Sequence, residues 1–112
     1  MSHEIISEEA LKSHLASEEP VWLIKHSITC GISDAAYGEY NAYLAANPDN
    51  KAAHILIQKQ RPLSNLTAEL LGRVHQSPQL FLVKNGEVLW TATHWSITAA
   101  AMQTAYQEAV AA

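Results

Sequence analysis

The sequence contains a single cysteine, Cys30, among 112 residues. One cysteine cannot form a disulfide within the chain, so a scaffold stabilised by internal disulfide bonds is excluded. In a reducing compartment, a lone cysteine is either an inert core residue or a reactive thiol. The choice between these two interpretations decides what the sequence implies about function.

Clusters of positive charge are also absent. The chain has 7 Lys and Arg residues, scattered singly, against 11 Asp and Glu residues, and its net charge is −4. Nucleic-acid binding needs clustered positive charge, so we expect no nucleic-acid partner. The 6 histidines form no HxxxH pair and no Cys/His cluster with zinc spacing. We therefore expect no metal site and no bound cofactor.

Long apolar runs are missing as well. No stretch approaches the roughly 18 apolar residues that cross a bilayer. Residues 1–4 lack the basic region and apolar stretch of a signal peptide, so we expect a cytoplasmic protein without membrane association. The apolar fraction of 48% is typical of globular proteins. The length of 112 residues predicts one domain, spanning residues 1–112.

The apolar pattern predicts alternating helices and strands. Helices are expected over residues 8–16, 31–46, 65–71 and 97–110, and strands over 21–24, 53–57, 80–83 and 88–90. Ser64 is the predicted N-cap of the third helix, and Gly72 is its predicted stop. Asn85-Gly86 favours a type I′ hairpin between the last two strands, because that turn needs positive φ at both positions.

The strand–helix–strand unit over residues 21–57 predicts two parallel strands joined by a right-handed crossover. The whole order, α-βαβ-α-ββ-α, is that of a thioredoxin-like fold. This fold is α/β, with a four-stranded mixed sheet and helices on both faces. Such an arrangement would bury every apolar run of the chain.

Cys30 follows the first predicted strand and stands at the first turn of the next helix. A helix N-terminus stabilises a thiolate and can lower a thiol pKa from about 8.5 to roughly 3.5–7.5. This position favours a reactive Cys30 over an inert one. In the motif Cys30-Gly31-Ile32-Ser33, Ser33 stands where a dithiol oxidoreductase has its second cysteine. Its hydroxyl can hydrogen-bond a thiolate but cannot form a disulfide, so the predicted chemistry is monothiol exchange.

Other candidate site residues surround this motif. Ser77-Pro78 precedes the third predicted strand, where thioredoxin folds place a cis-proline that faces the active cysteine. The predicted substrate-binding residues are Thr29, Gly31, Ser33, Ser77 and Pro78. His26 either stabilises the Cys30 thiolate when protonated or anchors the loop.

Three segments resemble one known family. Residues 25–33, Lys-His-Ser-Ile-Thr-Cys-Gly-Ile-Ser, resemble the Lys-His-Ser-x-Thr-Cys-x-Ile-Ser signature of the monothiol bacilliredoxins. Residues 75–79 resemble the His-Glu-Ser-Pro-Gln segment of that family, and residues 94–98 resemble its His-Trp-Asp-Ile-Thr segment. The resemblance extends through nearly the whole chain.

The resemblance implies a thiol–disulfide oxidoreductase that removes bacillithiol from S-bacillithiolated cytosolic proteins, with Cys30 accepting the bacillithiol. It implies S-thiolated proteins as partners, bacillithiol or another low-molecular-weight thiol as co-substrate, and a role in recovery from oxidative stress. Gln76 and Ser96 replace two carboxylates of the family pattern, and Gly31 stands where some members have proline. The two lost carboxylates change the charge that helps to select the small thiol, and no departure touches the nucleophile.

Two other functions stay open at this point. A non-catalytic thioredoxin-like module would bind a partner through the same groove and would keep Cys30 poorly accessible. Cys-Gly-Ile-Ser is also close to the Cys-Gly-Phe-Ser of monothiol glutaredoxins, which bind an iron–sulfur cluster with glutathione. Those proteins carry Gly-Gly-Cys-Asp after the hairpin, whereas residues 91–95 read Thr-Ala-Thr-His-Trp.

Overall fold

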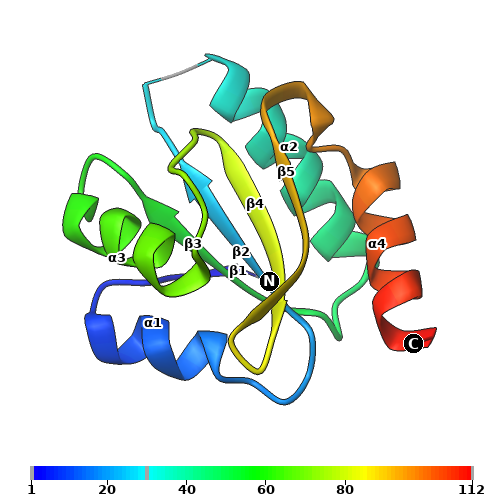
Figure 1. Cartoon of the computed structure of the whole chain (residues 1–112). Helices are drawn as coiled ribbons and strands as arrows, with labels where there is room; N and C mark the ends of the chain where they lie inside the picture. Colours follow the sequence, from blue (N-terminus) through cyan, green and yellow to red (C-terminus); the bar gives the residue numbers. More distant parts are fainter. Residues whose placement is uncertain (1, 30, 112) are drawn as a thin grey trace.

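A computed structural model of the chain describes residues 2–29 and 31–111. It contains a five-stranded mixed sheet in the order β1-β3-β2-β4-β5, with helices on both faces (Figure 1). The strands are β1 Ser2–Glu4, β2 Val21–His26, β3 Lys51–Leu56, β4 Gln79–Lys84 and β5 Glu87–Thr93. The helices are α1 Glu8–Leu15, α2 Gly31–Ala46, α3 Arg61–Leu71 and α4 Ala99–Ala111, with a short 3₁₀ helix, η1, at His94–Ser96.

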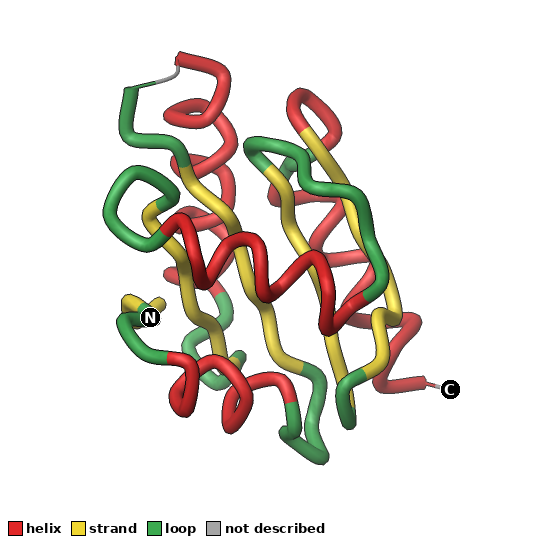
Figure 2. The backbone as a smooth tube through the Cα atoms, turned by 60° about the vertical axis from the view of Figure 1, so that its left-hand side comes forward, coloured by secondary structure: helices red, strands yellow, loops and turns green. Residues whose placement is uncertain are grey.

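β2 is the central strand and is buried along its whole length. Its side chains alternate between two cores, because successive residues of a strand point to opposite faces. Trp22 and Ile24 pack with α2 and α4, whereas Val21 and Leu23 pack with α1 and α3. The two pairs of helices lie on opposite sides of the sheet (Figures 1 and 2). The continuous apolar run of the sequence therefore belongs to a strand that is covered on both faces.

The pairing of β2 places three strand ends at one edge of the sheet. β2 is parallel to β3, with His26 opposite Leu56, and antiparallel to β4, with Lys25 opposite Gln79. β2 and β3 therefore end where β4 begins. We call this edge, formed by the ends of β2 and β3 and the start of β4, the carboxyl edge. The predicted parallel pairing of the first two long strands is confirmed.

Two predictions about turns are also confirmed. Asn85 and Gly86 have φ values of 52° and 76°, as a type I′ turn requires. Their N–H groups donate to the carbonyls of Ser17 and Leu15, which fastens the hairpin to the end of α1. Gly72 follows the last residue of α3 with φ 63°, in the left-handed region that ends many helices.

The predicted count of four strands was one too low. β1 is a fifth strand, parallel to β3 at an edge of the sheet. Its three residues, Ser-His-Glu, carry no apolar alternation, so their extended conformation depends on pairing with β3. Ile5 anchors them, since its side chain is fully buried and its N–H donates to the His54 carbonyl at 2.9 Å.

Two predicted helix starts were wrong. α3 begins at Arg61 rather than Asn65, because Pro62 fits the first turn, where its missing N–H removes no helical hydrogen bond. Ser64 is therefore not the N-cap but a buried residue inside α3. α4 begins at Ala99 rather than Ile97, and Thr98 Oγ1 accepts a hydrogen bond from the N–H of Ala101 in its first turn.

Candidate functional site at the carboxyl edge

The predicted nucleophile, Cys30, lies outside the described residues. The chain on either side of it is described: Thr29 belongs to the segment that leaves β2, and Gly31 is the first residue of α2. The N-terminus of this 16-residue helix brings the positive end of its dipole to the carboxyl edge. The helix start that the sequence predicts after Cys30 is thus confirmed, whereas the strand before it ends at His26, two residues later than predicted.

One side chain fastens the segment 27–29 that precedes Cys30. Gln58, in the turn after β3, donates from Nε2 to Ser27 Oγ at 2.7 Å and to Thr29 Oγ1 at 3.2 Å. Its Oε1 accepts from the N–H of Ile28 at 3.1 Å. These bonds tie the segment to the end of β3. Sequence reasoning missed Gln58, because a single glutamine distant in the chain belongs to no local pattern.

Ser33 lies in the first turn of α2 and is fully buried. Its Oγ accepts a hydrogen bond from the N–H of Ser27 at 2.8 Å and lies 2.9 Å from His26 Nδ1. The hydroxyl therefore joins the start of α2 to the end of β2. Contact between Ser33 and the Cys30 thiolate stays a prediction.

His26 is buried between the end of β2 and α2. Its ring stacks on Tyr37 with centroids 4.2 Å apart, and its Nε2 lies 3.9 Å from Asp34 Oδ1. Burial lowers the pKa of His26 below 6.5, and the opposing effects of Asp34 and Ser33 do not cancel this. The neutral imidazole is therefore favoured at neutral pH. These contacts anchor the strand end, and thiolate support by a protonated His26 stays a prediction.

The Ser77–Pro78 peptide is cis and directly precedes β4 at the carboxyl edge. Pro78 is buried, and its carbonyl accepts a hydrogen bond from the N–H of His94 at 3.2 Å. Ser77 Oγ is buried and has no hydrogen-bond partner among the described residues. An unpartnered buried hydroxyl is uncommon in proteins. It belongs to the peptide that the sequence predicts to contact substrate.

A cavity of about 600 Å³ opens between α2 and η1. Asp34 and Glu39 line it from α2, and His94 and Trp95 line it from η1. Trp95 is 69% exposed, so its indole adds exposed apolar surface to the lining of this cavity. Because His94 is hydrogen-bonded to Pro78, this cavity adjoins the Ser77–Pro78 peptide.

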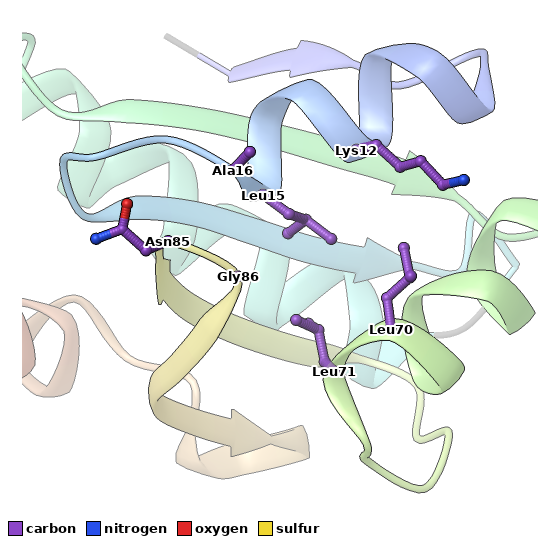
Figure 3. Close-up of a pocket in the computed structure, with 7 residues that line it drawn as sticks. All are labelled: Lys12, Leu15, Ala16, Leu70, Leu71, Asn85 and Gly86. Atoms are coloured by element: carbon purple, nitrogen blue, oxygen red, sulfur yellow. The ribbon is translucent and has the colours of Figure 1, made fainter.

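A second hollow lies at the opposite edge of the sheet. It measures about 330 Å³ and is lined by Lys12, Leu15, Ala16, Leu70, Leu71, Asn85 and Gly86 (Figure 3). The hairpin turn at its border follows β4, which runs antiparallel to β2, so the hollow is remote from the carboxyl edge. Lys12 is the one charged residue in this lining, and its Nζ forms a salt bridge with Glu8 Oε1 at 3.0 Å. This hollow offers no group for thiol chemistry.

Across residues 2–29 and 31–111, no three His, Cys, Asp or Glu side chains gather closely enough to hold a metal ion. None of the helices in the described part of the chain is both long and apolar enough to span a bilayer.

The fold and the arrangement at the carboxyl edge define a thioredoxin-fold protein. A solved structure described as having a thioredoxin fold is similar with a TM-score of 0.85 and 30% identity, over 93% of this chain and 92% of that chain. Thioredoxin from Trypanosoma brucei brucei has a TM-score of 0.80 at 12% identity, over 100% and 93% of the two chains. Thioredoxin from Malassezia sympodialis has a TM-score of 0.77 at 14% identity, over 96% and 90%. At these low identities, the two thioredoxins show the fold alone.

The match to a protein family is more specific than the shared fold. Residues 3–102 match the family described as monothiol bacilliredoxin BrxC. The chain belongs to this family, and the resemblance found in its sequence motifs is confirmed. Membership supports a thiol oxidoreductase-type function.

Proposed function

We propose that this protein is a monothiol thiol–disulfide oxidoreductase that removes bacillithiol from S-bacillithiolated proteins. The observation that carries the proposal is a single cysteine in a Cys-x-x-Ser motif within a chain of the monothiol bacilliredoxin family. The described residues on both sides of Cys30 add support. They connect the end of β2 to the N-terminus of α2, a position that favours a thiolate.

The proposed reaction consists of two thiol exchanges. In the first, the Cys30 thiolate attacks the bacillithiol sulfur of a protein mixed disulfide. That disulfide bond breaks, a new one forms to Cys30, and the protein cysteine leaves as a thiolate and takes a proton from water. In the second, a bacillithiol thiolate attacks the bacillithiol sulfur on Cys30 and releases the Cys30 thiolate. One mixed disulfide and one small thiol thus become one protein thiol and one bacillithiol disulfide.

Different residues of the carboxyl edge contribute to this reaction in different ways. Thr29 and Gly31 flank Cys30, and Gln58 holds the segment that contains Thr29. The backbone of Ser77 offers its N–H and C=O to the polypeptide of the substrate in a short β-like pairing. The N-terminal N–H groups of α2 stabilise the thiolate that attacks and is later released.

Intact mass spectrometry tests the proposal directly. The full chain is mixed with a protein that carries a bacillithiol mixed disulfide, and in parallel with the corresponding glutathione form. We expect a bacillithiol adduct on the wild-type chain that free bacillithiol reverses, and no adduct on Cys30→Ser, with the fold of both checked by circular dichroism. An adduct from glutathione alone would contradict bacillithiol as the co-substrate. No adduct from either would favour the non-catalytic binding module.

A further inference from the structure

A group of basic side chains lies on the α3 side of the carboxyl edge. Lys25, next to the end of β2, places its Nζ 3.1 Å from His75 Nδ1. Ser64 Oγ, from α3, lies 3.3 Å from the same nitrogen. Burial lowers the pKa of His75, and the positive charges of Lys25 and then Arg61 lower it further. Arg61 is the first residue of α3 and stands three positions before Ser64, so both lie on the face of the helix that meets His75. The three basic residues therefore form one cluster.

Lys25 is an unusual residue for the interior of a protein. It is 0% exposed, and no salt bridge joins it or Arg61 to a carboxylate within the described residues. A buried charge without a counter-ion is costly. Burial lowers the pKa of Lys25 to about 8, so the ammonium form still dominates at neutral pH. Replacing a buried charge by an apolar side chain of similar volume is often neutral or stabilising.

The chain around this cluster is poor in negative charge. Residues 51–86 form β3, α3, β4 and their connections, and they contain five of the 7 Lys and Arg residues but one of the 11 Asp and Glu residues. The basic residues are Lys51, Lys59, Arg61, Arg73 and Lys84, and the acidic one is Glu69. Lys51 is ion-paired with Glu19, and Arg73 and Lys84 lie towards the opposite edge of the sheet. Lys59 and Arg61, which follow the end of β3, are the basic residues of this segment next to the carboxyl edge, where they attract anions.

We propose that Arg61 and His75 form an anion subsite that binds a carboxylate of the low-molecular-weight thiol. The buried positive charge of Lys25, next to His75, contributes to this subsite through space. This inference rests on the proposed function and names the residues that recognise the co-substrate. Bacillithiol and glutathione both carry carboxylates besides their thiol. A guanidinium matches a carboxylate with two parallel N–H bonds. Nδ1 of His75 accepts from the Lys25 ammonium, so the neutral ring carries its proton on Nε2. Because His75 is exposed, this Nε2–H is the group that can donate to a carboxylate.

The segment that carries His75 is fixed beside the Ser77–Pro78 peptide. Gln79, buried at the start of β4, donates from Nε2 to the Val74 carbonyl at 3.1 Å and accepts on Oε1 from the N–H of Gln76 at 3.2 Å. These bonds hold residues 74–76 against the strand that follows the peptide. The anion subsite is therefore placed next to the peptide at which we expect the mixed disulfide to bind.

Anion binding can be measured without thiol exchange. The isotopically labelled Cys30→Ser chain is titrated with succinate, a dicarboxylate that lacks a thiol, at constant ionic strength, and the ring resonances of His75 are followed by NMR. We expect saturable shifts at millimolar succinate and an affinity about tenfold lower in Arg61→Gln. Arg73→Gln is the matched control, because it removes the same charge beyond the other end of α3. Absent shifts, or equal effects of the two substitutions, would overturn the anion subsite.

Lys25→Met tests the buried charge, since it keeps an unbranched side chain but removes the ammonium. We expect succinate affinity to fall about threefold, because Lys25 acts on the anion through space rather than by contact. The unfolding midpoint should rise at the same time, because an uncompensated buried charge is removed. A more stable variant that binds succinate as tightly as the wild type would contradict a contribution of Lys25 to the anion subsite.

Turnover identifies the small thiol and separates the two proposals. In a chain with intact Cys30, Arg61→Gln should raise KM about tenfold for the carboxylate-bearing thiol, bacillithiol or glutathione, with kcat unchanged. Exchange with mercaptoethanol, which has no carboxylate, should be unaffected. If the wild type exchanges no thiol, the proposed function fails, whereas succinate binding still decides the anion subsite. If Arg61→Gln slows all thiols alike, the anion subsite is wrong and the proposed function stands.

Discussion

Gln58 joins two parts of the chain that are distant in sequence and meet at the carboxyl edge. Its amide forms hydrogen bonds with Ser27, Ile28 and Thr29, the three residues before Cys30. The side chain is exposed and fills no core. Replacing it should therefore change the freedom of the segment 27–29 much more than the stability of the fold.

We expect Gln58→Ala to lower kcat/KM for thiol exchange about tenfold, because a freer segment holds the nucleophile less often in a productive geometry. The free energy of unfolding should change by less than about 1 kcal/mol. Steady-state exchange assays and urea unfolding measure the two effects. An exchange rate equal to that of the wild type would show that Gln58 has no positioning role.

Gln58→Glu is the control for this prediction. A carboxylate accepts from the N–H of Ile28, and the hydroxyls of Ser27 and Thr29 can rotate to donate to it. The hydrogen bonds are kept and a negative charge is added beside Thr29, the residue before Cys30. The pH midpoint of alkylation by iodoacetamide should move upward in Gln58→Glu, because a nearby negative charge disfavours the thiolate. At a pH above this midpoint, Gln58→Glu should keep kcat/KM near the wild-type value, because the hydrogen bonds to the segment 27–29 are kept. A loss as large as that of Gln58→Ala would contradict positioning through these bonds.

At the scale of elements, α2 connects the site to the core. Its inner face contributes Tyr40, Tyr43 and Leu44 to the core that also contains Trp22. The Tyr40 hydroxyl donates to the Ala53 carbonyl of β3 at 2.9 Å, and Ser33 is bonded to the end of β2. The N-terminus of α2 is therefore held at the carboxyl edge by contacts along the helix, which fixes the direction of its dipole.

Gly38 is the residue of α2 at which stability should be easiest to gain. It stands inside the helix, is exposed, and a Cβ added there would meet nothing within 4 Å. We expect Gly38→Ala to raise the free energy of unfolding by about 1 kcal/mol, because glycine loses more backbone entropy in a helix than alanine. Urea unfolding followed by circular dichroism measures the change.

Gly86→Ala is the matched control for Gly38→Ala. A Cβ at Gly86 would also meet nothing within 4 Å, but its φ of 76° is a conformation that L side chains rarely adopt. This substitution should destabilise the protein by about 1 kcal/mol. Equal effects of the two substitutions would contradict backbone conformation as the cause.

Across the whole molecule, several histidines link separate elements while partly or fully buried. His14 Nε2 lies 2.8 Å from the Trp22 carbonyl oxygen, and His54 Nδ1 lies 2.7 Å from Ser2 Oγ. Burial is the largest cause of the lowered pKa of both residues and of His26. The folded protein therefore favours the neutral form of all three rings.

This burial makes stability depend on pH below the ordinary histidine pKa of 6.5. Because the folded-state pKa values are depressed, the unfolded chain binds more protons in this range. The stabilisation is present above the unfolded value and is lost as the pH falls towards the folded values. We expect the free energy of unfolding to decrease between about pH 7 and about pH 5. Urea unfolding at constant ionic strength measures this, and a constant stability would contradict it.

The sequence by itself determined the order of the long elements and the place of Cys30 among them. The strand at residues 21–24, the Asn85–Gly86 turn and the Gly72 stop are all signalled by residues within a few positions of one another. Apolar periodicity and turn chemistry are local properties, so they can be recognised in the sequence without knowledge of the fold. The Cys-x-x-Ser motif at the start of a helix belongs to the same class of local signal.

Only the tertiary structure decided which distant segments meet. β1 is a strand because β3 offers it an edge, and α3 begins at Arg61 while Ser64 turns toward His75. The contacts of Gln58 with the segment 27–29 and of Lys25 with His75 join residues far apart along the chain. A glutamine or lysine has the same local sequence signal whether it is buried or exposed. Its role therefore follows from the strand edges and helix faces that the fold brings together.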